Sequence, residues 1–149
     1  MQVVAGCVIE KDGKILMVKE AKESCYGQWN FPAGHVDEHE AIMDAAIREA
    51  FEETGCKVRL TGTLPISTVY LKNGESVILL KFVAEIINEE IKFDTSEILD
   101  VQWIDIDILR NMGEDELRGY DSAKQTLKDF EENNIYPLEI YDDGIYVRG

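Results

Sequence analysis

The stretch GHVDEHEAIMDAAIREAFEETGC, residues 34–56, decides how the rest of the chain is interpreted. Its glutamates Glu49, Glu52 and Glu53 stand at positions i, i+3 and i+4, and an α-helix places such side chains on one face. Like charges at these spacings destabilise a helix by roughly a few tenths of a kcal/mol per pair. A hard divalent cation with oxygen ligands relieves this crowding, whereas the simpler alternative is an acidic helix face in solvent.

We expect this helix to span residues 40–54, with Gly55 as the left-handed residue after its end. Acidic residues at 37–40 suit the positive end of the helix dipole. One arc should pack on a sheet, and a small residue, Ala45, should keep the acidic arc open; the packing arc contains Met43, Ala46, Ile47 and Ala50. Arg48 precedes Glu52 by four residues, and we expect its guanidinium to hold Glu52 and Glu40 and so orient the acidic face.

The spacing of this stretch resembles the Nudix box of the Nudix (MutT-like) hydrolases. A glycine, a glutamate, an Arg-Glu pair, a Glu-Glu pair and a second glycine follow one another at the family's intervals, namely Gly34, Glu40, Arg48-Glu49, Glu52-Glu53 and Gly55. The resemblance implies an α+β fold, an α/β/α sandwich with a mixed β-sheet between helices. It also implies a Mg²⁺-dependent enzyme, with Mn²⁺ as the alternative ion, that hydrolyses a diphosphate linkage. His39 departs from the glycine often found before the box glutamate.

The remaining sequence predicts strands around this helix and one further helix. Apolar or β-branched runs indicate strands at 3–9, 14–19, 57–60, 67–71, 76–87 and 101–104. Asp12-Gly13 and Asn73-Gly74 are hairpin signals. A helical turn is expected at 107–112 and an amphipathic helix at 122–132, capped by Asp121 or Ser122. Residues 136–147 alternate tyrosine and isoleucine, which leaves a terminal hairpin, a substrate lid and an oligomer contact open.

Composition narrows the function further. At 149 residues the chain suits a single domain, residues 1–149. Its net charge of -15 argues against binding duplex nucleic acid or an anionic membrane, and it makes a cation necessary to bridge protein and phosphate substrate. Three cysteines without CxxC spacing predict reduced thiols in a cytoplasmic protein. The sequence leaves monomer and homodimer open.

The family resemblance also assigns candidate site residues. Glu49, Glu52 and Glu53 would bind the metal together with the backbone carbonyl of Ala33, and Arg48 would orient them. The general base would be one of these glutamates or Glu97, although an isolated glutamate such as Glu97 is more often solvated. Side-chain chemistry, rather than the resemblance, adds candidates for substrate contact: the aromatic rings of Trp29, Phe31, Tyr70 and Tyr120 for stacking and His35 for phosphate. Core packing is the more frequent role of such rings.

The box does not select the substrate. The segment around 29–35 and the late stretch LRGYDSAKQTLKDFEENNIYPLEI look like the bacterial Nudix phosphatases, which act on nucleoside di- and triphosphates and on thiamine-pathway pyrophosphates. The alternative function is a non-catalytic Nudix-like module that senses a nucleotide. Such modules usually lose box carboxylates, and this chain keeps them all.

Overall fold

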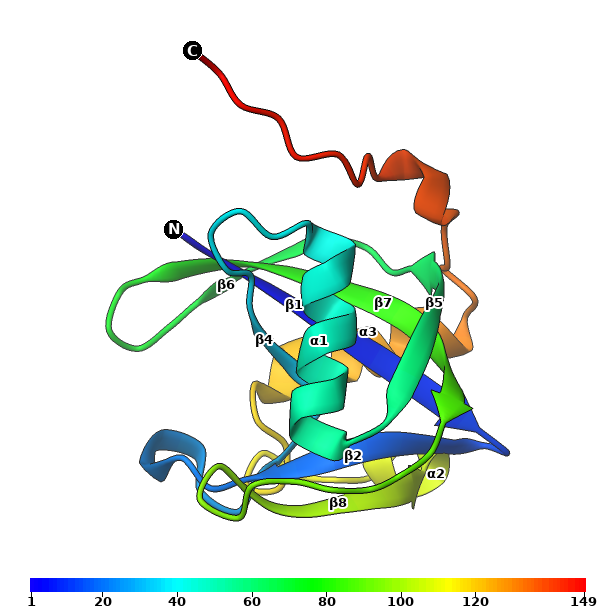
Figure 1. Cartoon of the computed structure of the whole chain (residues 1–149). Helices are drawn as coiled ribbons and strands as arrows, with labels where there is room; N and C mark the ends of the chain where they lie inside the picture. Colours follow the sequence, from blue (N-terminus) through cyan, green and yellow to red (C-terminus); the bar gives the residue numbers. More distant parts are fainter.

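A pair of long parallel strands forms the centre of the protein. The computed structural model describes residues 1–149, and its strands β1 (Gln2–Lys11) and β7 (Ser76–Asn88) pair in parallel from Gln2↔Val77 to Ile9↔Ala84 (Figure 1). Both strands are rich in valine and isoleucine, whose branched side chains favour a pleated, buried surface. The runs predicted at 3–9 and 76–87 are therefore confirmed as strands.

Antiparallel strands extend this pair on both sides. β5 (Lys57–Thr63) and β6 (Ser67–Tyr70) pair with β7, and the short β4 (Ala33–His35) pairs with β1. Parallel and antiparallel pairs thus occur together, and the expected mixed sheet is confirmed.

The far end of β1 turns into a second group of strands. A two-residue turn, with positive φ at Asp12 and Gly13, connects β1 to β2 (Lys14–Glu20), as the Asp-Gly pair predicted. β2 then pairs with β8 (Ile98–Asp105) on one edge and with the two-residue β3 (Trp29–Asn30) on the other. The predicted strand at 101–104 is therefore part of a longer one.

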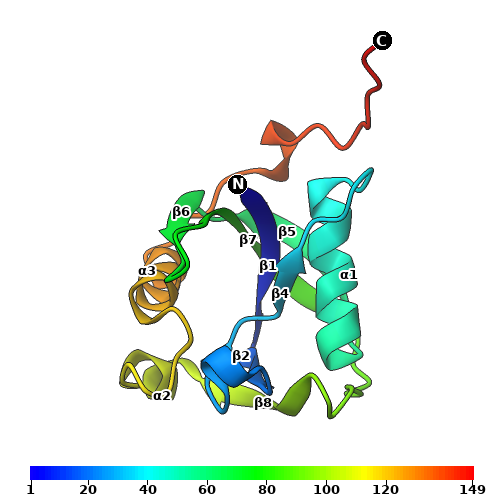
Figure 2. The same cartoon turned by 90° about the vertical axis from the view of Figure 1, so that its left-hand side faces the viewer.

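Helices cover both faces of the strands. Helix α1 (Ile42–Thr54) lies on one side, and α2 (Ile106–Arg110) and α3 (Tyr120–Glu131) lie on the other (Figure 2). Short 3₁₀ turns occur at Glu23–Cys25 and Leu138–Ile140. Two groups of buried side chains fill the layers, one beneath α1 and one beneath α2 and α3. The predicted α/β/α sandwich is confirmed.

Helix α1 differs from the prediction at its start and in its packing. It begins at Ile42, so Glu40 lies in the preceding loop, while Gly55 adopts the expected left-handed conformation with φ of 81°. Ala45 is fully buried and Ile47 is exposed, so the roles predicted for these two residues were wrong. The core arc is rotated relative to the prediction because it includes Ala45, Ala46, Ala50 and Thr54.

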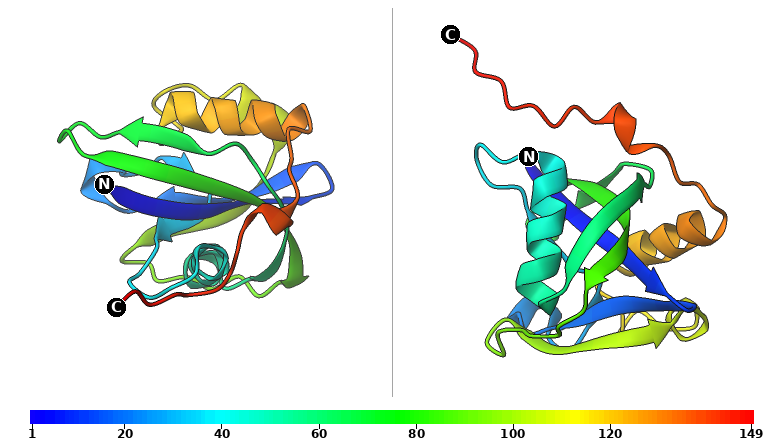
Figure 3. Two further views of the ribbon diagram at one scale, coloured as in Figure 1. Left: turned by 90° about the horizontal axis from the view of Figure 1, so that it is seen from above. Right: turned by 45° about the vertical axis from the view of Figure 1, so that its right-hand side comes forward.

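The last fifth of the chain holds one further correction and excludes one of the alternatives left open. Helix α3 starts after Gly119, which has a φ of 59°, and neither Asp121 nor Ser122 caps it. Residues 136–147 form no terminal hairpin. The segment instead crosses to the α1 side of the sheet, where the ring of Tyr141 packs 5.1 Å from that of Phe82 (Figure 3).

All three cysteines are buried and unpaired. None of the helices combines the length and the apolar character needed to cross a membrane.

Candidate active site

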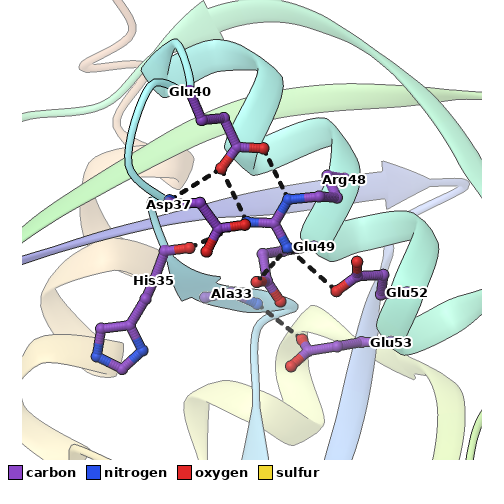
Figure 4. A network of polar contacts seen from close by, with 8 residues as sticks. All are labelled: Ala33, His35, Asp37, Glu40, Arg48, Glu49, Glu52 and Glu53. Atoms are coloured by element: carbon purple, nitrogen blue, oxygen red, sulfur yellow. Dashed lines mark hydrogen bonds and ion pairs between the residues drawn. The ribbon is translucent and has the colours of Figure 1, made fainter.

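Arg48 is the centre of a network that joins α1 to the loop before it (Figure 4). Its Nε and Nη2 donate to the two carboxylate oxygens of Glu40 at 2.7 and 2.9 Å. Its Nη1 donates to Glu49 at 2.8 Å and to Glu52 at 3.1 Å. The expected contacts of Arg48 with Glu40 and Glu52 are present, and Glu49 is an additional partner.

The same guanidinium anchors the loop backbone. Nη2 also donates to the carbonyl oxygen of His35 at 3.0 Å, and Glu40 accepts from the Asp37 amide at 3.0 Å. The hydrogen bond from Arg48 lowers the pKa of Glu40, and its carboxylate partners raise the pKa of Arg48, so both groups stay charged. Because the planar Arg48 guanidinium donates to several acceptors of the loop at once, it holds the loop in one position against α1.

Glu49 packs directly against a glycine of β4. A Cβ atom at Gly34 would lie 2.2 Å from the Glu49 carboxyl carbon, so any larger residue would push the Glu49 carboxylate away from β4. Partial burial raises the pKa of Glu49, and Arg48 opposes that rise. The close approach of the Glu49 carboxylate to β4 is therefore the physical reason for glycine at this position of the box.

Glu53 occupies the most buried position of the three box glutamates. The amide of Ala33 donates to its carboxyl group at 2.9 Å. Burial raises its pKa to about 8, and the nearby acids Glu20 and Glu49 add to this rise. The protein itself supplies no ion pair to Glu53, so a bound cation would be the partner that neutralises its charge.

The three box glutamates lie on one face of α1, but the protein alone does not draw them into a chelating cluster. Glu49 and Glu52 are turned to Arg48, whereas Glu53 is turned to Ala33. No group of three acidic, histidine or cysteine side chains is close enough to hold a metal ion as they stand. The donor set is nevertheless suited to Mg²⁺ or Mn²⁺, because it consists of hard carboxylate oxygens and includes a buried carboxyl without a cationic partner.

Strand pairing adds residues that the sequence did not indicate. Glu20, at the end of β2, is only 3% exposed and accepts from Arg118 at 3.2 Å and from Asn30 at 3.3 Å. Lys81, in the middle of β7, is 6% exposed and holds its Nζ 4.2 Å from the centre of the Phe31 ring. One signal was available, since Lys81 is the only charged residue in the otherwise apolar run 77–84.

The predicted substrate-contacting residues are dispersed. Trp29 is half-buried beneath Lys19, and Phe31 is 1% exposed in the core, the role that is more frequent for such rings. The His35 side chain is exposed beside Gln2, and Tyr120 begins α3 and packs on the core beneath it. Tyr70 is 78% exposed on β6.

Glu97 lies in the turn before β8, where its carbonyl oxygen accepts from the Ala21 amide. No hydrogen bond or ion pair joins the side chains of Glu97, Tyr70 or Tyr120 to the box glutamates. The roles assigned to these residues stay predictions.

Comparison with known proteins supports the fold and the family resemblance. The sequence profile of the NUDIX domain matches residues 1–130, and the chain belongs to the Nudix family. A Nudix hydrolase from Nitrosomonas europaea superposes with a TM-score of 0.86 and 30% identity, covering 97% of this chain and 99% of that one.

Curated relatives include two phosphatases. The zebrafish 8-oxo-dGDP phosphatase NUDT18 is 43% identical over 53 residues, which are 36% of this chain and 16% of that protein. The Escherichia coli phosphatase NudJ is also 43% identical over 53 residues, which are 36% of this chain and 34% of that protein. The alignment therefore spans about a third or less of each phosphatase.

Proposed function

We propose that this protein hydrolyses a diphosphate linkage in a nucleotide or a related small-molecule pyrophosphate, with Mg²⁺ or Mn²⁺ as cofactor. The observation that supports the proposal is the Arg48 network, which holds Glu49 and Glu52 on the same face of α1 as the buried Glu53. The names of the similar phosphatases NudJ and NUDT18 support a phosphorylated substrate. Nucleoside di- or triphosphates and thiamine-pathway pyrophosphates are the substrate classes to test first.

In this proposal Glu49, Glu52, Glu53 and the carbonyl of Ala33 hold the divalent ion. A bound divalent ion would neutralise charge on the phosphate oxygens and favour in-line attack by water. Arg48 fixes the directions of Glu49 and Glu52, and the Ala33 amide fixes that of Glu53. One of these glutamates, or Glu97, accepts the proton of the attacking water.

The compartment proposed for this activity is the cytoplasm. Three buried, unpaired cysteines support a reducing environment. The expected partner is a small phosphorylated molecule, bound by a monomer or a homodimer.

A phosphate-release screen tests the proposal. The substrates are nucleoside di- and triphosphates, dinucleotides, sugar nucleotides and thiamine diphosphate, each with and without Mg²⁺. We expect metal-dependent release from at least one of them, and loss of turnover by orders of magnitude in Glu53→Gln. The matched control is Glu10→Gln, which removes a charge from an exposed position of β1 without altering turnover. Binding without turnover by the wild type would favour the sensing module instead.

A further inference from the structure

Lys81 is a buried cation on the side of β7 that faces away from α1. Its neighbours Leu80 and Phe82 belong to the core beneath α1. Because successive side chains of a strand point to opposite faces, Lys81 enters the other layer, and its Nζ lies over Phe31. A lysine that is only 6% exposed is unusual, since burial disfavours its charged form by several kcal/mol unless the ammonium is paired.

No hydrogen bond or ion pair holds the Lys81 ammonium, although acidic residues outnumber basic ones by 30 to 15. The structure also contains no fully enclosed side-chain nitrogen or oxygen without a partner. The unpaired Nζ therefore keeps a small contact with solvent.

The charges near Lys81 have both signs. Burial lowers the pKa of Lys81 to about 8; Cys7 and Glu53 oppose that effect, and the positive charge of Arg118 adds to it. Arg118 uses one donor on Glu20, at 3.2 Å, and no other side-chain hydrogen bond occupies its guanidinium. The same segment, residues 29–33, contacts all three groups. The Arg118 amide donates to the Trp29 carbonyl oxygen at 3.0 Å, the Lys81 Nζ lies over the Phe31 ring, and the Ala33 amide donates to Glu53.

We propose that Lys81 and Arg118 form an anion site for a phosphate group of the substrate, adjacent to the carboxylates of α1. This inference rests on the proposed function and makes it more specific, because it requires a substrate with at least two neighbouring phosphates. A protein with a net charge of -15 repels such a substrate, and a local pair of cations offsets that repulsion where the substrate binds. The ammonium supplies a point charge and the guanidinium a directed fork for phosphate oxygens.

The test measures binding of a diphosphate rather than turnover. Imidodiphosphate, a diphosphate analogue that resists hydrolysis, is titrated calorimetrically into the full chain in millimolar Mg²⁺. In Lys81→Met the dissociation constant should rise about tenfold or more, as expected for loss of a charged hydrogen bond. Lys11→Met is the matched control, because Lys11 also lies over an aromatic ring, that of Trp103, but pairs with Glu89 at the exposed end of β1. Its affinity should equal that of the wild type.

Lys81→Gln provides a second neutral side chain, and the melting temperatures of both variants show whether the fold is kept. If either folded variant binds imidodiphosphate within about twofold of the wild type, or if the wild type shows no saturable binding, the anion site is refuted. Failure of the proposed function gives another pattern: Lys81-dependent binding with no turnover of any substrate. Turnover that does not change in Lys81→Met, together with unchanged binding, removes the anion site and leaves the hydrolase proposal intact.

Discussion

Neutralising Glu53 should stabilise the protein when divalent ions are absent. Burial raises the pKa of this carboxyl from 4.5 to about 8, so the folded state binds more protons than the unfolded state within that interval. The protonated form contributes stability that is fully present below about pH 4.5 and is lost as the pH rises through about 8. In Glu53→Gln this dependence disappears because the side chain no longer titrates.

The size of the effect follows from the shift. Between about pH 4.5 and about pH 7, the free energy of unfolding of the wild type should fall by about 3 kcal/mol relative to that of Glu53→Gln. This is an upper value, because Glu53 retains some contact with solvent. For a chain of this length that free energy corresponds to roughly 6–12 °C in melting temperature. Thermal unfolding in EDTA, followed by circular dichroism across this pH range, measures it.

Millimolar Mg²⁺ should remove most of this difference between the two proteins. Binding to the folded state alone adds about 2.7 kcal/mol at a concentration of about one hundred times the dissociation constant, and only the wild type should gain it in full. Two outcomes would refute the claim that Glu53 is a buried carboxyl that binds a cation. One is that the melting temperatures of the wild type and Glu53→Gln change in parallel with pH in EDTA; the other is that Mg²⁺ raises both by the same amount. Glu10→Gln, at an exposed position, should follow the wild type throughout.

Three further predictions concern the surroundings of Glu53. Gly34→Ala should lower turnover at least about tenfold, because its Cβ would lie 2.2 Å from the Glu49 carboxyl carbon and would push that carboxylate away from β4. The free energy of unfolding should fall by less than about 1 kcal/mol, since the displaced group is the end of a flexible side chain. Urea unfolding and initial rates test this, with Gly113→Ala, whose nearest neighbour is at 4.0 Å, as an expected neutral control. Arg48→Lys should lower kcat, because an ammonium cannot hold Glu40 through two parallel bonds and Glu49 as well; unchanged kcat would contradict the orienting role. Lys81 keeps its proton in the unfolded chain but loses it at about pH 8 in the folded one. The free energy of unfolding of the wild type should therefore rise from about pH 8 towards pH 9 relative to that of Lys81→Met. A difference in this free energy that does not change with pH would oppose the burial of the Lys81 charge.

The local part of the site was predictable because helical geometry depends only on spacing along the chain. The offsets within α1 predicted that Arg48 would reach Glu52, and the box predicted Glu40 as a further partner. The rotation of the helix was predicted less well. Ala45 and Ile47 exchanged their expected environments because the packing partner of α1, and not its own periodicity, determines which small residues are covered.

The non-local part of the site depends on strand order, which spacing does not show. Glu20 reaches the site because β2 pairs with β3 and β8, and Lys81 because β7 pairs in parallel with β1. Neither pairing follows from the sequence pattern of one strand. The C-terminal tyrosines illustrate the same limit, since their alternation left several arrangements open and did not indicate that Tyr141 packs on Phe82.

The position of β4 explains how a short segment brings these local and distant residues together. A Cβ atom at Gly6 of β1 would lie 2.6 Å from the Cβ of Ala33, and one at Gly34 would overlap the Glu49 carboxyl. Two glycines on opposite sides therefore let β4 fit between the central strand and α1. In that position the Ala33 amide reaches Glu53, and Phe31, two residues earlier, reaches beneath the Lys81 ammonium. Because one four-residue span contacts both the acidic and the cationic residues, a displacement of β4 should disturb metal binding and phosphate binding together.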